Sequence, residues 1–95
     1  MAKITVKLFG VLRIDTHVAC EELDVARVAD IFGILNKKVD AIYAENKKKD
    51  ALLKRPEELS FKDAIVFIDG ERCSKKNHEF KGGEEVWLLS PASGG

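Results

Sequence analysis

The sequence has no excess of charge of either sign: 16 Lys and Arg residues balance 16 Asp and Glu residues, and the formal net charge is zero. There is therefore no overall basic field to attract nucleic acid and no overall acidic field to attract a basic partner. The one basic run, at residues 47–49, is flanked by Glu45 and Asp50 and has no interleaved aromatic residue. We interpret this run as a solvated face and expect no nucleic-acid partner.

Long hydrophobic runs and export signals are also missing. No apolar run approaches the roughly 20 residues that a membrane helix needs. A strand pattern starts as early as Ile4, so we expect no signal peptide. Cysteine is scarce, with two residues in the chain. Without export signals these two are expected to be free thiols in a reducing compartment. The sequence predicts a cytoplasmic protein with no membrane partner.

Motifs for enzymatic chemistry are missing as well. Neither the GxGxxG pattern nor the P-loop pattern for nucleotides is present, and there is no GxSxG nucleophile motif. His17 and Cys20, together with Cys73 and His78, have spacings that could ligate zinc. The alternative is two partly buried cysteines and two surface histidines. We favour it because the expected fold places the two cysteine strands at opposite edges of the sheet, too far apart for a shared metal or a disulfide. We therefore expect no metal site and no bound cofactor.

The first half of the chain has a strand pattern followed by a helical one. Strict alternation over residues 4–9 predicts a strand with one buried face and with Phe9 on the other face. A turn at residues 10–15 and a weaker strand at 17–23 are expected next. Apolar residues then recur at helical spacing, which predicts an amphipathic helix over residues 26–39, with Asp24 as a candidate cap. Its apolar stripe consists of Val28, Ile31, Phe32, Leu35 and Val39. A second, more polar helical segment is expected over residues 40–54.

The second half of the chain predicts three more strands. Residues 64–68 form the most strand-like run, and Asp69-Gly70 predicts a two-residue hairpin that returns over residues 71–73. Phe80 is expected to tuck under the sheet before a last strand at residues 85–89. One main helix over one face of a mixed sheet of four to five strands, with an extra helical segment, is an α+β two-layer domain.

The chain ends in small residues. Pro91 biases Ser90 toward an extended conformation, so the tail is expected to project from the domain. Glycine has no Cβ, and Gly94-Gly95 is therefore slim enough to enter a narrow channel. The Gly95 carboxylate is ionised at neutral pH and is a poor electrophile, so chemistry there requires activation. The alternative is an ordinary frayed terminus.

Three stretches of the chain resemble the ubiquitin-like β-grasp fold and, within it, the MoaD/ThiS sulfur carriers. KLFGVLR at residues 7–13 is similar to the family's first strand, and ARVADIF at residues 26–32 is similar to its helix opening. FKGGEEVWLLSPASGG at residues 80–95 aligns without a gap with the family's C-terminal pattern. The departures from this pattern are Gly82, Ser90 and Ala92. The resemblance implies a β-grasp domain over residues 1–89 and a flexible tail over residues 90–95.

The resemblance also implies that the tail is chemically activated. A MoeB-like partner would use ATP to adenylate the Gly95 carboxylate, and a persulfide sulfur would replace AMP and leave a thiocarboxylate. A MoaE-like large subunit would pass this sulfur to a pterin precursor, building the dithiolene that holds molybdenum or tungsten. Gly94 and the flexible Ser93 would let the tail enter both active sites. The chain would then be the small subunit of molybdopterin synthase and would catalyse nothing alone.

Partners of such a carrier are expected to dock on the exposed apolar side of the sheet. Phe9 and Leu89 match positions where the family has contact aromatics, with ordinary packing as the alternative for both. Either Val66 or Phe67 is expected beside them. Pro91 and Ser93 complete the predicted partner-binding residues.

Two other functions remain open. In the first, a lysine of a target protein attacks the activated Gly95, and the chain is a ubiquitin-like protein modifier. In the second, the domain is an adaptor without tail chemistry. The acceptor, sulfide or amine, is not part of this chain.

Overall fold

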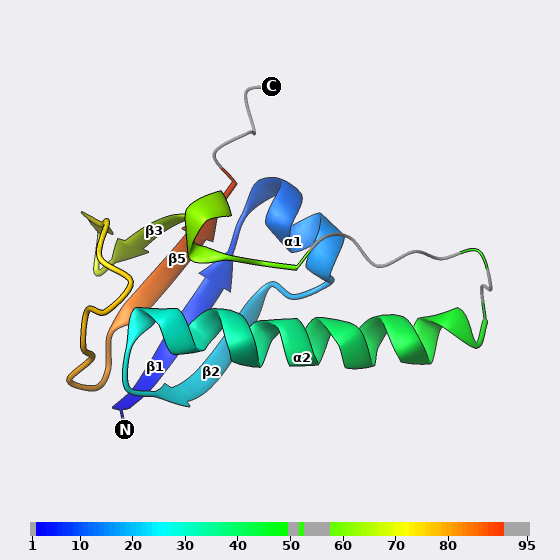
Figure 1. Ribbon diagram of the computed structural model, residues 1–95, viewed down its shortest axis with the longest axis horizontal. Helices are drawn as coiled ribbons and strands as arrows, with labels where there is room; N and C mark the ends of the chain where they lie inside the picture. The colour runs from blue at the N-terminus through cyan, green and yellow to red at the C-terminus, as the bar shows by residue number, and fades with distance from the viewer. Residues whose placement is uncertain (1, 50–51, 53–57, 91–95) are drawn as a thin grey trace.

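Five strands form one mixed sheet, and a long helix lies across one of its faces (Figure 1). The computed structural model describes residues 2–49, 52 and 58–90. The sheet order is β2-β1-β5-β3-β4, with β1 and β5 parallel and every other neighbouring pair antiparallel. The strands are β1 (Ala2–Leu8), β2 (Cys20–Val25), β3 (Ile65–Ile68), β4 (Glu71–Cys73) and β5 (Glu85–Leu89). This arrangement confirms the predicted α+β fold class.

The helix α2 (Val28–Lys47) supplies the second layer of the domain. Its apolar stripe faces the sheet, and Ile31 and Leu35 are completely buried. The stripe continues from Val39 to Tyr43, and one helix of 20 residues replaces the two helical segments that the sequence predicted. The predicted cap was also wrong. Asp24 lies in β2, and the backbone N–H of Arg27 instead donates to Asp30 Oδ2 at 3.0 Å, which satisfies a group at the start of the helix.

A short helix, α1 (Gly10–Thr16), occupies the stretch where the sequence predicted a turn. The Thr16 hydroxyl donates to the Leu12 carbonyl at 2.7 Å and accepts from the Val18 N–H at 3.1 Å. The Tyr43 hydroxyl of α2 donates to the Asp15 carbonyl. The Thr16 bonds close the C-terminal end of α1, and the Tyr43 bond fastens that end to α2, which extends beyond the strands (Figure 1).

The β3–β4 hairpin has the turn that its sequence predicted. Asp69 and Gly70 have φ angles of 50° and 87°, as the two central residues of a type I′ turn require. The Asp69 side chain also accepts a hydrogen bond from the Glu85 N–H at 2.9 Å and so joins the turn to β5. The hairpin and the last strand are confirmed. A single turn of 3-10 helix, η1 (Phe61–Asp63), precedes β3.

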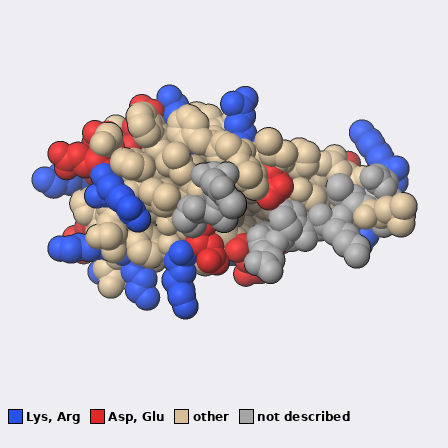
Figure 2. Space-filling model, turned by 90° about the horizontal axis from the view of Figure 1, so that it is seen from above, with Lys and Arg blue, Asp and Glu red and all other residues tan. Residues whose placement is uncertain are grey.

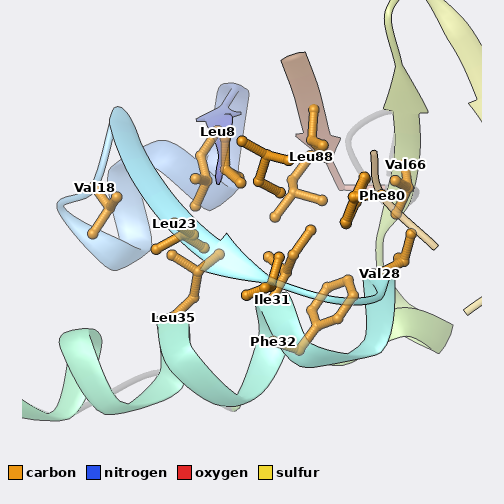
Figure 3. Packing of buried hydrophobic residues seen from close by; sticks show 14 of the residues in the cluster. Leu8, Val18, Leu23, Val28, Ile31, Phe32, Leu35, Val66, Phe80 and Leu88 are labelled. Carbon is orange, nitrogen blue, oxygen red and sulfur yellow. The ribbon is translucent and has the colours of Figure 1, made fainter. Parts of the chain in front are cut away.

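The core lies between the sheet and α2 (Figure 3). Alternate residues of the central strands point into it, and Val6 and Val86 are completely buried. Phe80 is 8% exposed, which confirms that it tucks under the sheet. The opposite face of the sheet has no helix over it among the described residues, and its side chains are therefore open to solvent or to a partner.

Candidate functional site

Three aromatic side chains meet on the open face of the sheet. The register places Trp87 of β5 beside Phe67 of β3, with ring centroids 6.3 Å apart. Phe9 follows β1, and its ring meets Trp87 edge to face at 5.7 Å. Leu89 lies on the same face, two residues after Trp87. We call these four residues the aromatic patch; Phe9 and Trp87 are 38% and 37% exposed. Large aromatic rings left at this exposure are typical of contact surfaces.

Polar contacts hold Trp87 in place within the patch. Its indole Nε1–H donates to Glu85 Oε1 at 2.6 Å, and Lys7 Nζ pairs with the same oxygen at 3.1 Å. These two hydrogen bonds, the one from Trp87 first, lower the pKa of the Glu85 carboxyl below its usual value. Glu85 is therefore ionised at neutral pH and fixes the indole on the face of the sheet.

The structure separates the predicted contact residues into two groups. Phe9, Phe67 and Leu89 lie on the open face, as predicted. Val66 is 1% exposed and points into the core beneath the sheet (Figure 3), so its placement among the contact residues was wrong. Consecutive strand residues point to opposite faces, and Phe67 can therefore be open only when Val66 is buried.

The predicted reactive tail begins where the described residues end. Pro91, Ser93, Gly94 and Gly95 lie outside the described residues. Ser90 follows Leu89 directly, and five residues span at most about 18 Å when fully extended. Ser90, the last described residue, therefore lies next to the patch, directly after Leu89. In the view of Figure 2, Lys and Arg side chains project mainly from the margins of the described surface.

Comparison with known proteins identifies the fold. No protein-family model and no curated protein sequence matches the chain. Among solved structures, the small archaeal modifier protein 1 (SAMP1) of Methanosarcina acetivorans is similar at a TM-score of 0.69 and 25% identity, covering 100% of this chain and 98% of that one. The chain has a ubiquitin-like β-grasp fold.

Two further structures extend the comparison to molybdopterin-converting factors. A Pyrococcus furiosus protein assigned as molybdopterin converting factor subunit 1 has a TM-score of 0.64 and 23% identity, covering 97% of this chain and 100% of its own. A complex of subunits 1 and 2 of molybdopterin-converting factor from Helicobacter pylori contains a chain with a TM-score of 0.50 and 17% identity, and the coverage is 98% and 99%. The structural neighbours of this β-grasp chain thus include converting-factor subunits and archaeal modifiers.

Trp87 is the patch residue that sequence reasoning missed. It is the central ring of the three, yet only Phe9, Phe67 and Leu89 of the four were singled out. The signal was present in the alternation of β5, because Trp87 shares a face with Leu89 while Val86 and Leu88 face the core. An exposed tryptophan on such a strand indicates a contact surface.

The cysteines lie as the β-grasp strand order predicts. Cys20 is on β2 and Cys73 on β4, the two opposite edges of the sheet, and both are free thiols. Within residues 2–49, 52 and 58–90, no group of three or more His, Cys, Asp or Glu side chains is placed to hold a metal ion.

Among the described residues, no helix is both long enough and apolar enough to cross a membrane.

Proposed function

We propose that this chain is a sulfur carrier that acts as the small subunit of molybdopterin synthase. A MoeB-like enzyme adenylates the Gly95 carboxylate with ATP, and a MoaE-like large subunit later takes the sulfur for the pterin dithiolene. The chain itself binds no cofactor in this scheme. The observation that carries the proposal is the aromatic patch, two of whose residues, Trp87 and Leu89, lie on β5, the strand that precedes the Gly94-Gly95 end of the sequence.

The position of the patch gives the tail its direction. Trp87 and Leu89 are part of β5, which is hydrogen-bonded to β1 on one side and to β3 on the other. A partner that covers the patch is therefore held in a fixed position relative to Ser90. The tail can then reach a reactive centre within about 18 Å of that residue. The Helicobacter pylori complex, in which a similar fold is paired with a second subunit, supports a partner of the same kind here.

The chemistry follows from the weakness of a carboxylate as an electrophile. A carboxylate oxygen attacks the α-phosphorus of ATP and releases pyrophosphate, and the acyl adenylate formed has AMP as a good leaving group. The terminal sulfur of a persulfide on a partner displaces AMP and gives an acyl disulfide. A partner thiol then attacks this disulfide, releases the thiocarboxylate and forms a disulfide between the two partner sulfurs. The chain contributes the slim tail and the docking surface, and the partners supply every catalytic group.

Intact mass spectrometry of the protein isolated from its native cells tests this proposal. A species heavier by one sulfur minus one oxygen, with fragmentation that places the change on Gly95, is the expected result. The sequence of the final fragment also establishes whether the mature chain ends at this residue. A chain that carries no such species while the cofactor is being made would refute the sulfur-carrier proposal.

A second candidate is the protein modifier, which the similarity to the Methanosarcina SAMP1 favours. An amine of a target lysine then attacks the acyl adenylate in place of sulfide. No Lys or Arg follows Lys81, so trypsin leaves the whole segment 82–95 attached to a modified lysine. Detection of that branched remnant on other proteins would support the modifier function. If the thiocarboxylate is present and the remnant is absent, only the sulfur-carrier function is supported.

A further inference from the structure

Exposed apolar side chains gather at one end of the molecule and extend beyond the aromatic patch. The large hydrophobic residues that stand exposed in the described part of the chain are Phe9, Val11, Ile14, Leu52 and Trp87. Phe9 and Trp87 belong to the patch, and Leu52 follows α2 in the sequence. Val11 and Ile14 lie on α1, where they are 47% and 71% exposed. We call these two residues the α1 ridge.

The ridge has no part in the packing of the domain. Residues four apart on a helix share a face, and Leu12 and Thr16 form the inner face of α1. Leu12 packs against the core, and Thr16 is buried. Ile14 follows Leu12 by two residues, about 200° of helical rotation, and therefore points away from the core. Isoleucine and valine are also weaker helix formers than glutamine or lysine. Polar residues at both ridge positions would therefore serve the fold equally well.

The ridge adjoins the aromatic patch through Phe9. This residue directly precedes α1, its backbone N–H donates to the Leu88 carbonyl at 3.0 Å, and its ring meets Trp87. Gly10 has a φ angle of 59° where the chain turns from β1 into α1. The helix thus begins at the edge of the patch and lies beside β5 (Figure 1). The apolar surface continues from the open face of the sheet onto α1.

Hydrogen bonds hold the ridge in a fixed position relative to the patch. The Thr16 hydroxyl donates to the Leu12 carbonyl at 2.7 Å, and the Tyr43 hydroxyl of α2 donates to the Asp15 carbonyl. A surface that is already ordered loses less conformational entropy when a partner binds. Figure 2 looks down on the end of the molecule where α1 lies, and Lys and Arg side chains lie mainly at the margins of that view. A single apolar partner surface therefore fits the patch and the ridge together.

We propose that the α1 ridge is a second contact for the MoaE-like large subunit, so that its docking surface runs from the aromatic patch over α1. The inference rests on the proposed function, which supplies the occupant, and on the continuity of the apolar surface. The large subunit places apolar side chains opposite Val11 and Ile14. A partner that fits the patch alone leaves the ridge in water, and the ridge therefore favours partners that fit both surfaces.

Calorimetry of the full chain with the MoaE-like large subunit from the same organism tests the proposal. The double variant Val11→Gln, Ile14→Gln removes the ridge without a change of charge and should bind about tenfold more weakly. Its heat-capacity change on binding should also be less negative than that of the parent chain, because less apolar surface is buried. Both side chains are exposed, so the variant should melt at or above the temperature of the parent.

Two further variants separate the possible outcomes. Ala41→Gln adds the same side chain at an exposed position of α2 and should leave the affinity unaltered. Trp87→Ala reports on the patch alone. If Trp87→Ala weakens binding and the double variant binds like the parent, the ridge proposal is wrong and the proposed function stands. An equal loss in Ala41→Gln would also overturn the ridge. If the large subunit does not bind even the parent chain, the proposed docking fails and the ridge proposal fails with it.

Discussion

Replacing Gly33 with alanine should stabilise the free domain. The residue lies inside α2, its backbone is helical, and an added Cβ meets nothing within 4 Å. Alanine then gains the full difference in helix propensity, about 0.8–1.0 kcal/mol, with no steric cost to subtract. A domain of this size shifts its melting temperature by about 4–8 °C for each 1 kcal/mol. We therefore expect Gly33→Ala to melt several degrees above the parent chain.

Gly70→Ala is the matched control for this experiment. A Cβ at Gly70 also meets nothing within 4 Å, but its φ is 87°, a region that costs an L-residue about 1–2 kcal/mol. The two substitutions add the same methyl group to open space and should change the free energy of unfolding in opposite directions. Urea denaturation followed by circular dichroism measures both. A destabilised Gly33→Ala would mean that the helix is not continuous at this position, and the reasoning would fail.

Three further predictions concern Trp87 in the aromatic patch, the hydrogen bonds between Asn36 and Leu59, and Glu84 in the turn before β5. Trp87→Ala should weaken binding of the proposed MoaE-like large subunit about tenfold or more, measured by calorimetry, because central aromatic anchors dominate interfaces. Asn36→Ala should cost about 1–3 kcal/mol in chemical denaturation, since the amide donates to the Leu59 carbonyl at 2.8 Å and accepts from its N–H at 2.7 Å. For Glu84, partial desolvation raises the carboxyl pKa, but backbone N–H groups of the turn outweigh it and the net pKa is lowered from 4.5. The contribution of the Glu84 carboxylate to the free energy of unfolding should be complete above about pH 4.5 and should disappear as the pH falls through the lower pKa of the folded state. A carboxyl-carbon NMR titration measures this folded-state pKa directly.

Each of these predictions has an outcome that contradicts it. Unchanged affinity in a folded Trp87→Ala variant would exclude the patch as a docking surface. An Asn36→Ala variant as stable as the parent would show that solvent replaces both hydrogen bonds to Leu59. A Glu84 carboxyl that titrates above 4.5 would mean that its hydrogen bonds to the Lys81 and Gly82 N–H groups, at 2.8 and 2.6 Å, do not persist in solution.

Local patterns predicted the elements whose side chains alternate or recur regularly. The alternation of β1 and the apolar stripe of α2 both consist of residues that are close together in the sequence. The buried face of each element was therefore predicted correctly. The helix α1 was missed because distant groups hold it. The Tyr43 hydroxyl bonds to the Asp15 carbonyl, and these residues are far apart in the sequence. Seven residues make a marginal helix without such tertiary support.

Only part of the candidate site was predicted, because the rest of it depends on contacts between residues that are far apart in the sequence. Alternation requires Val66 and Phe67 to face opposite ways, but both are apolar, and the residues themselves do not decide which is buried. Pairing decides it: Val66 lies opposite Leu88, whereas Phe67 lies opposite Trp87. The same pairing places Trp87 at the centre of the patch. The functional face therefore depends on long-range register, which a local pattern cannot supply.

The position of β5 is compatible with both proposed functions. Because β5 lies between two hydrogen-bonded neighbours, the direction of the chain at Ser90 is fixed relative to Trp87 and Leu89. In both proposals a partner that covers the patch would fix where the tail enters its active site, whether the acceptor is a persulfide or a target lysine. In the two proposed reactions both acceptors attack the same activated carbonyl, and nothing on the described surface distinguishes one acceptor from the other. If the tail is activated as we propose, the partner decides between sulfur transfer and protein modification, and exchanging the partner should exchange the reaction.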